Sequence, residues 1–86
     1  MTRRINEDYI RDVVEKTQQA IDDGYTAFWD EEIIPITSID EDYIMLGNIC
    51  LVQFDNQFED MADMPLTRIK VELTMRLKLF KEITLW

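Results

Sequence analysis

The first long segment of the chain, residues 6–23, has the spacing of an amphipathic helix. Asn6 is suited to cap its first turn, where Glu7 and Asp8 would face the positive end of the helix dipole. Residues that recur three and four positions apart would share one helix face: Ile10, Val13, Val14, Thr17 and Ile21. Gly24 is suited to end the helix, because glycine readily adopts positive φ. The pattern therefore predicts an N-terminal helix over residues 6–23.

A second pattern surrounds an acidic triplet at residues 30–32. An aromatic run at residues 25–29 precedes the triplet, and a β-branched run at residues 33–37 follows it. Pro35 suits an edge strand, since proline cannot donate a hydrogen bond to a neighbouring strand. We therefore expect two short strands joined by an acidic turn.

The middle of the chain fits a β-hairpin. Gly47 and Asn48 separate two apolar runs, at residues 43–46 and 49–54, as a two-residue hairpin loop does. Several residues of these runs are β-branched, which also favours strands.

The alternative for residues 39–62 is a helix. Ser38 and Glu41 fit a capping box. The residues that then fall at helical spacing are Ile39, Tyr43, Leu46, Cys50, Phe54, Phe58 and Met61. The hairpin is the favoured interpretation, and it leaves residues 55–64 as a polar loop with one helical turn around residues 58–62.

The last segment alternates between apolar and polar positions. The apolar positions are Ile69, Val71, Leu73, Met75, Leu77 and Leu79, and the polar ones are Arg68, Lys70, Glu72, Thr74, Arg76 and Lys78. A period of two is typical of a strand, so the pattern predicts a long strand with a bend near Phe80. The pattern resumes in Ile83, Leu85 and Trp86. The basic side chains would lie on the solvent face and pair with carboxylates of neighbouring strands.

Together these elements predict one α+β domain over residues 1–86, in which one N-terminal helix packs on an antiparallel sheet of four to five strands. Hydrophobic residues form 47% of the chain, which is enough for a core. No apolar run resembles a signal peptide or approaches the roughly 20 residues that span a bilayer. The single cysteine, Cys50, excludes an internal disulfide. We therefore expect a cytoplasmic protein, in a cell or in an infected host.

The charge is strongly acidic and uneven. The chain has 18 acidic and 9 basic residues, a net charge of −9, yet no Lys or Arg lies between Asp22 and Asp63. A surface of this sign repels phosphates, so we expect no direct contact with nucleic acid or with an anionic membrane.

Catalytic and metal chemistry find little support. The chain has no histidine, and Ser38, its one serine, lies in no nucleophile motif. Cys50 falls in an apolar run, where we expect a buried, inert thiol. Gly24 and Gly47 stand too far apart for a phosphate-binding loop, and no acidic cluster matches the calcium-binding loop. We therefore expect neither an enzyme nor a bound cofactor or metal.

The acidic region instead predicts a binding surface. Regularly spaced carboxylates can place negative charge where a nucleic acid places phosphates. We therefore expect an inhibitor that docks an anionic, DNA-mimicking face on a basic partner such as a nuclease or another nucleic-acid-binding protein. Trp29 would be an aromatic anchor beside this face. The predicted binding residues are Asp22, Asp23, Trp29, Asp30, Glu31, Glu32, Asp40, Glu41, Asp42, Asp55, Glu59, Asp60 and Asp63.

No family motif is present. In size and charge the chain is similar to small phage-encoded inhibitors and to immunity-type proteins, and this similarity implies a compact, acidic protein that blocks a basic target. The alternative function is a structural or assembly module, a homodimer or other small homo-oligomer formed through the long C-terminal strand.

Overall fold

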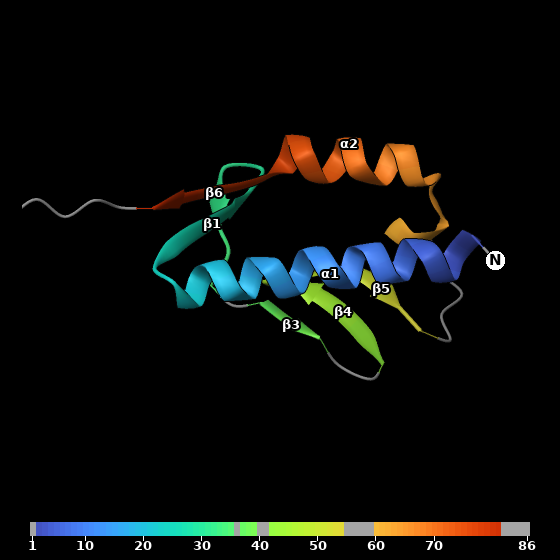
Figure 1. Cartoon of the computed structure of the whole chain (residues 1–86), viewed down its shortest axis with the longest axis horizontal. Helices are drawn as coiled ribbons and strands as arrows, with labels where there is room; N and C mark the ends of the chain where they lie inside the picture. Colours follow the sequence, from blue (N-terminus) through green and yellow to red (C-terminus); the bar gives the residue numbers. More distant parts are fainter. Residues whose placement is uncertain (1, 36, 40–41, 55–59, 82–86) are drawn as a thin grey trace, which may run out of the picture.

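The computed structural model describes residues 2–35, 37–39, 42–54 and 60–81 (Figure 1). The helical elements are α1 (Thr2–Asp22), the 3₁₀ helix η1 (Met61–Asp63) and α2 (Leu66–Arg76). The strands are β1 (Tyr25–Trp29), β2 (Glu32–Ile33), β3 (Thr37–Ile39), β4 (Tyr43–Leu46), β5 (Ile49–Gln53) and β6 (Leu77–Lys81). They form two antiparallel sheets, β2-β1-β6 and β3-β4-β5. The α+β class is confirmed, but the described chain has a second α-helix and two three-stranded sheets in place of one sheet.

Helix α1 buries the stripe that the sequence predicted. Ile10 and Val14 are fully buried, while Val13 and Ile21 are half-buried against the same core. Thr17 is also buried, and its hydroxyl donates a hydrogen bond of 2.8 Å to the carbonyl of Val13, which satisfies it inside the helix. Figure 1 shows α1 lying along the sheet β3-β4-β5 and also beneath α2.

Both ends of α1 follow from its residues. Gly24 has φ +100° just after the helix, as predicted for a glycine that ends it. The helix begins at Thr2, before the predicted start, so Asn6 lies inside it and does not cap it. The Asn6 amide instead donates hydrogen bonds of 2.8 Å to the carbonyls of Ala62 and Met64. This buried side chain therefore fixes the segment that leads into α2 against α1.

The predicted hairpin is confirmed. Strands β4 and β5 pair with Leu46 opposite Ile49, and Gly47 has φ +65° in the two-residue loop between them. Residues 43–54 are therefore not helical. The inner side of this sheet supplies the largest part of the core, since Ile44 and Leu46 of β4 and Leu51 and Val52 of β5 are at most 2% exposed.

Part of the predicted loop after the hairpin lies outside the described residues. This applies to residues 55–59, so the turn expected around residues 58–62 is described only from Asp60 onward. There η1 begins, and the Asp60 carboxylate accepts a hydrogen bond of 3.1 Å from the backbone N–H of Ala62.

Helix α2 corrects the predicted strand over residues 68–79. Ile69 and Leu73, four residues apart, are buried in the core, and Leu77 after the helix is half-buried. Val71 and Met75, which the alternating pattern placed on the same side, are 54% and 67% exposed. A spacing of four residues fits both the helical period of about 3.6 and the strand period of two, so the sequence pattern does not distinguish a helix from a strand here.

Local interactions explain why this segment is helical. The Glu72 carboxylate lies 3.9 Å from Arg68 and 3.0 Å from Arg76, one turn away on either side. Such pairs stabilise helices, and most residues of the segment are good helix formers. The Thr74 hydroxyl also donates to the carbonyl of Lys70 at 2.7 Å. The alternation therefore arose within an amphipathic helix that exposes two of its apolar residues.

Strand β6 is the part of the predicted C-terminal strand that does form. It follows α2 without an intervening loop and pairs with β1, with Leu79 opposite Ala27. Of the expected basic stripe, Lys78 is on β6, and its ammonium contacts the carbonyl of Thr74 at 3.1 Å. The other basic residues of the stripe lie on α2 rather than on a strand. Among the described residues, Arg76 at the end of α2 does pair with a carboxylate of the acidic region, that of Asp30 at 3.8 Å. The prediction for residues 83–86 lies outside the described residues.

Candidate functional site

The sheet β2-β1-β6 has an exposed apolar side. Alternate residues of a strand point to opposite sides, so Ala27 and Trp29 of β1 face the core while Phe28 points outward. Ile33 of β2 lies opposite Phe28 in the register and is 65% exposed. Phe80 of β6 is 59% exposed, and its ring meets that of Phe28 edge to face, with centroids 5.5 Å apart.

Met75 of α2 completes this surface. It lines a hollow of about 520 Å³ together with Phe28 and Phe80. We call Phe28, Ile33, Met75 and Phe80 the outer apolar face. Contiguous exposed apolar side chains of this kind typically mark an interaction site.

The rim of the hollow is charged. The acidic residues are Asp30 and Glu31, and the basic ones are Arg76 and Lys78. Asp30 lies 3.8 Å from the Arg76 guanidinium, which is also bound to Glu72. Opposite charges therefore border the same apolar surface.

The acidic turn, residues 30–32, adopts an unfavourable backbone conformation. Asp30 and Glu31 have φ of +51° and +72°, and they link β1 and β2 where Trp29 pairs with Glu32. Two-residue turns with positive φ at both positions normally contain Asn-Gly. A residue with a side chain costs about 1–2 kcal/mol in this conformation relative to a right-handed one. Retaining carboxylates here at that cost suggests a role for the side chains.

Two carboxylates of the acidic turn have no ion-pair partner within the described residues. All nine Lys and Arg residues belong to the described part of the chain, and none forms an ion pair with Glu31 or Glu32. Both residues are exposed. Negative charge at the turn is therefore available to another molecule.

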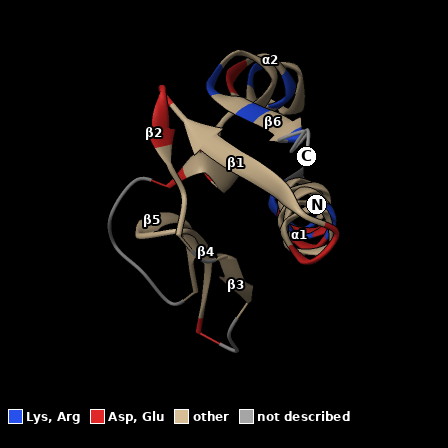
Figure 2. Cartoon of the chain, turned by 90° about the vertical axis from the view of Figure 1, so that its left-hand side faces the viewer, with Lys and Arg blue, Asp and Glu red and all other residues tan. Residues whose placement is uncertain are grey.

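The structure separates the other predicted carboxylates. Asp22 and Asp23 are exposed at the end of α1, where the amides of Gln18 and Gln19 donate to them at 3.2 and 3.3 Å. Asp42 is exposed just before β4. Among the described residues, Figure 2 shows acidic side chains at three separate places: the tip of β2, the end of α1 and near the start of β4.

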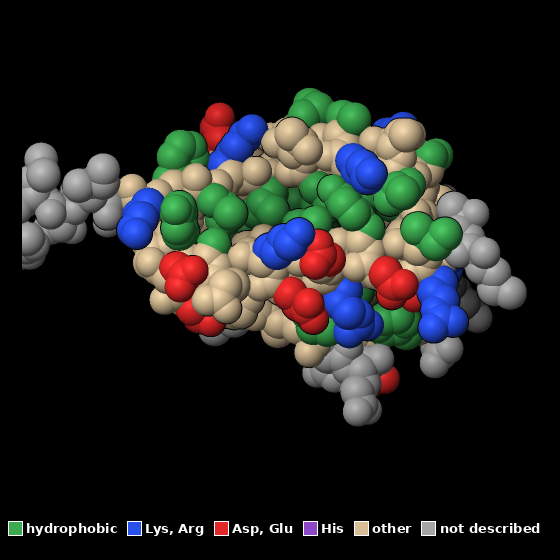
Figure 3. Space-filling view, viewed as in Figure 1, with side chains coloured by type: hydrophobic (Ala, Val, Ile, Leu, Met, Phe, Trp, Pro, Cys, Tyr) green, Lys and Arg blue, Asp and Glu red, His purple; other side chains and the backbone are tan. Residues whose placement is uncertain are grey.

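The side that carries α1 has mixed charge. Lys16 lies 2.8 Å from Asp12, and Arg3 lies 3.0 Å from Glu7, each pair one turn apart on the helix. In Figure 3, Lys and Arg side chains alternate with Asp and Glu along this side, and apolar side chains follow the seam between α1 and α2.

Asp60 and Asp63 are bound within the molecule. The Arg3 guanidinium contacts both carboxylates, and it lies 2.8 Å from that of Asp60, whose side chain is only 5% exposed. The hydrogen bond with Asp60 is the main cause that raises the pKa of Arg3 above its ordinary value. Arg3 therefore neutralises two carboxylates of the segment from Asp22 to Asp63, which contains no Lys or Arg.

Trp29 is a core residue in this structure. It is 7% exposed, and the Arg76 guanidinium lies 5.9 Å from its ring centroid, within the range of a cation–π contact. The exposed aromatic residues nearby are Phe80 and, at 38%, Tyr25. The remaining predicted site residues lie outside the described part of the chain: Asp40, Glu41, Asp55 and Glu59.

Cys50 is exposed, contrary to the prediction of a buried thiol. It lies on β5 between half-buried Ile49 and buried Leu51, so its side chain points away from the core. Partial burial of the sulfur and the negative charge of Asp60 raise the pKa of the thiol above its ordinary value. Its thiolate fraction is therefore reduced even though the residue is accessible.

The sequence analysis did not identify the outer apolar face. Phe80 was assigned to a bend, and Ile33 and Met75 to a strand interior. The signal that could have found the face is the pair Leu79-Phe80, because consecutive apolar residues in a strand place one on each side of the sheet.

Among the described residues, neither α-helix has the length and apolar composition needed to cross a bilayer. In the same part of the chain, no three His, Cys, Asp or Glu side chains are grouped so that they could hold a metal ion.

No protein-family model matches the chain, and searches of curated proteins and of solved structures find no match either. A function is therefore inferred from the outer apolar face, the acidic turn and the residues around them.

Proposed function

We propose that this chain is a non-catalytic binding protein that docks its outer apolar face and acidic turn on a basic surface of another protein. The observation that carries the proposal is the position of the strained acidic turn at the border of the outer apolar face, in which Ile33, Met75 and Phe80 are exposed and Phe28 is half-buried. A partner would cover the apolar side chains and supply cations to the carboxylates.

The energetics favour contact at this surface. Burying one large apolar side chain that was exposed contributes about 1.5–3 kcal/mol. Phe80, Ile33 and Met75 are each at least 59% exposed, so a partner that covers them would gain much of this free energy from each side chain. The edge-to-face contact with Phe28 holds the Phe80 ring in place, which reduces the entropy lost on binding.

The net charge favours a basic partner. At −9, the chain attracts cationic proteins over distances of about a Debye length and accelerates their encounter. Glu31 and Glu32 would then form direct ion pairs with Lys or Arg of the partner. Nucleases and other nucleic-acid-binding proteins have suitable basic surfaces, so an inhibitor of the phage or immunity type remains our proposed class.

The acidic turn is the expected contact rather than an extended DNA-mimicking face. Asp22 and Asp23 lie at the end of α1, away from the turn, while Asp60 and Asp63 are bound by Arg3. These distant carboxylates would assist encounter but would not contact the partner at the same time as residues 30–32.

Paired charge-removing variants test the proposal. The partner is captured from source-cell extract at low and high salt, and its affinity is then measured with the purified proteins. Replacing Glu31 and Glu32 with Gln should weaken binding at least 10-fold, whereas replacing Asp22 and Asp23 with Asn should change it less than 3-fold. Equal losses in the two double variants would contradict docking at the turn, and no loss in either would contradict the proposal.

A second candidate, a homodimer through the same surface, is favoured by the mixed rim. The rim contains Asp30 and Glu31 as well as Arg76 and Lys78, so acidic residues of one copy could meet basic residues of a second copy across a two-fold axis. Light scattering would then give a two-chain mass that Phe80→Ser reduces to one. A one-chain mass at millimolar concentration would exclude this candidate.

A further inference from the structure

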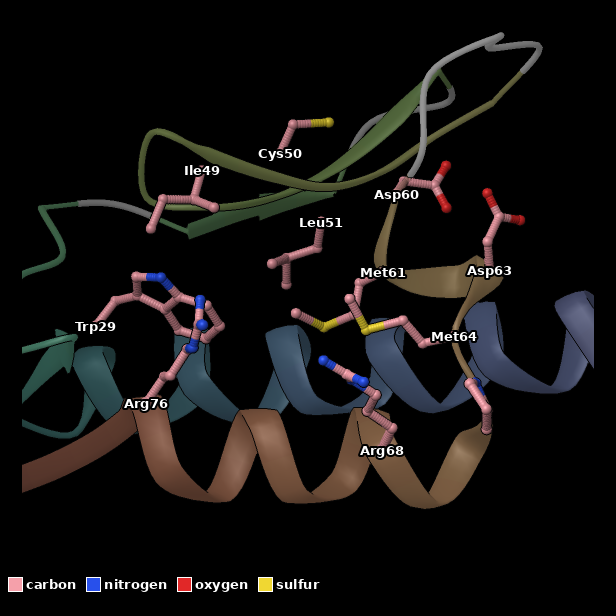
Figure 4. A pocket seen from close by; sticks show the side chains of 11 residues that line it. Trp29, Ile49, Cys50, Leu51, Asp60, Met61, Asp63, Met64, Arg68 and Arg76 are labelled. Atoms are coloured by element: carbon pink, nitrogen blue, oxygen red, sulfur yellow. The ribbon is translucent and has the colours of Figure 1, made fainter.

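A second hollow lies between β5, η1 and α2, on the opposite side of the sheet β2-β1-β6 from the outer apolar face. Its volume is about 580 Å³, which is within the range of ligand-binding pockets, about 300–1,000 Å³. Three consecutive residues of β5 line it: Ile49, Cys50 and Leu51. Successive side chains of a regular strand point to opposite sides of the sheet, but the register between β4 and β5 shifts at Leu51, which has no partner on β4. This irregularity at the outer edge of the sheet lets three consecutive residues line one cleft. We call this hollow the edge cleft (Figure 4).

Strand β5 is an outer strand of its sheet, so its far edge has no neighbouring strand among the described residues. At one end of this edge, the backbone of Gln53 is occupied. Its N–H donates to the Asp60 carboxylate at 3.3 Å, and its carbonyl accepts from Arg3 at 3.4 Å. Ile49, Cys50 and Leu51, earlier in the same strand, line the cleft instead.

The floor of the edge cleft is apolar and adaptable. Met61 and Met64 are half-buried there, and Trp29 lies beside them at the β1 end. Figure 4 shows the two methionine side chains between β5 and α2. Methionine side chains adjust their shape to different partners, which suits a site that accepts an apolar side chain from another protein.

The α2 wall of the edge cleft is basic. Arg68 is 66% exposed in its side chain, and its ion pair with Glu72 is long, at 3.9 Å, since Glu72 is bound more closely by Arg76 at 3.0 Å. In Figure 4 both arginine side chains extend from α2 toward β5. Most of the Arg68 guanidinium is therefore free for a carboxylate, which it can bind through two parallel hydrogen bonds.

We propose that the edge cleft binds an extended segment of a partner protein, which adds to β5 as a strand. Its backbone would pair with residues 49–51, an apolar side chain would contact Met61 and Met64, and an acidic side chain would bind Arg68. Strand addition of this kind draws affinity from main-chain hydrogen bonds and specificity from alternate side chains. An acidic segment is favoured over a basic one because Arg68 and Arg76 face it, while Asp60 and Asp63 are already bound by Arg3.

Selection from a library of random octapeptides displayed on phage tests this proposal with the full-length chain. Selected peptides should combine an acidic residue with an apolar one and bind with dissociation constants below 1 mM by fluorescence anisotropy. Arg68→Glu should weaken binding at least 10-fold. The matched control is Lys70→Glu on the same helix, where Lys70 lies over the Tyr9 ring and away from the cleft, and it should change binding less than 3-fold.

Two further readouts locate the peptide. A bound strand should slow hydrogen exchange of amides in residues 49–51 at least 10-fold and protect Cys50, the one cysteine of the chain, from a maleimide. The Glu31, Glu32 double variant should bind the peptide unchanged, so the edge cleft and the proposed docking at the acidic turn can fail independently. Failure to select any peptide, or slowed exchange on β6 without any on β5, would overturn the proposal.

Discussion

The two sheets of this protein have the same number of described strands and opposite roles. Sheet β3-β4-β5 lies against α1, and Ile44, Leu46 and Val52 are completely inaccessible to solvent. Sheet β2-β1-β6 buries Ala27 and Trp29 on one side, and on the other it exposes Ile33 and Phe80 and leaves Phe28 half-buried.

This difference separates stability from recognition. The covered sheet supplies the buried core residues Ile44, Leu46, Leu51 and Val52, and the open sheet retains exposed apolar area that another molecule can cover. Substitutions in the first should therefore change the free energy of unfolding, and substitutions on the outer side of the second should change binding.

The largest effect is expected for Ile44→Ala in the covered sheet. Ile44 is 0% exposed, and truncating a buried isoleucine leaves a cavity that costs about 2–5 kcal/mol. Urea denaturation measures the loss. Ile33→Ala in the open sheet is the matched control, and it should cost less than about 1 kcal/mol because Ile33 is 65% exposed. Similar losses for both variants would show that the two sheets do not differ in this way.

The next effect concerns the contact that holds the segment before α2 against α1. Asn6→Ala leaves the carbonyls of Ala62 and Met64 without their amide donor, which should cost about 1–3 kcal/mol. Thermal unfolding would show the lower midpoint. The control is Asn48→Ala in the exposed hairpin loop, where a change of less than about 0.5 kcal/mol is expected. A change no larger than the control would show that the buried amide does not fix this segment.

A glycine substitution in the acidic turn should stabilise the protein instead of destabilising it. Glu31→Gly removes a side chain at φ +72°, so we expect the free energy of unfolding to rise by about 1 kcal/mol. Binding of the basic partner should weaken at the same time. Glu32→Gly within β2 is the control, and it should not stabilise the protein, because Glu32 is in a strand. Destabilisation by Glu31→Gly would contradict the strain assigned to the turn.

The smallest effect on stability is expected for Phe80→Ser on the outer apolar face. The ring is 59% exposed, and its loss should cost less than about 1 kcal/mol, mainly through the contact with Phe28. Partner binding measured by calorimetry should fall at least 10-fold. Lys81→Ser, also exposed on β6, serves as the control for changes that weaken the strand without altering this face. A large loss of stability with binding unchanged would assign Phe80 to the fold instead of to recognition.

The sequence predicted those elements in which one period was unambiguous. The stripe of Ile10, Val13 and Val14 fits only a helix, and the Gly47-Asn48 loop fits a hairpin, and both predictions are confirmed. The strand predicted over residues 68–79 was wrong for its first part, because Ile69 and Leu73, four residues apart, fit a helix and a strand equally well. The exposure of Val71 and Met75 and the ion pairs of Glu72 with Arg68 and Arg76 distinguish the helix.

The candidate site was predicted less well than the fold. The sequence showed the acidic turn, since residues 30–32 are consecutive. It could not show that Arg3 reaches Asp60 and Asp63 from the far end of the chain, because that contact depends on how α1 and η1 pack. The outer apolar face likewise combines residues from β1, β2, α2 and β6. The pairing of β1 with its two neighbours brings Phe28, Ile33 and Phe80 together, and the direct continuation of α2 into β6 places Met75 beside them.

The direct junction between α2 and β6 has a mechanical consequence. Arg76 ends the helix, Leu77 begins the strand, and the Arg76 carbonyl accepts a hydrogen bond of 3.1 Å from the backbone of Asp30. No residue separates the two elements, and Arg76 at their junction lines both the hollow at the outer apolar face and the edge cleft. If an occupant of one surface displaces Arg76, ligands at the two surfaces change each other's affinity by the same factor.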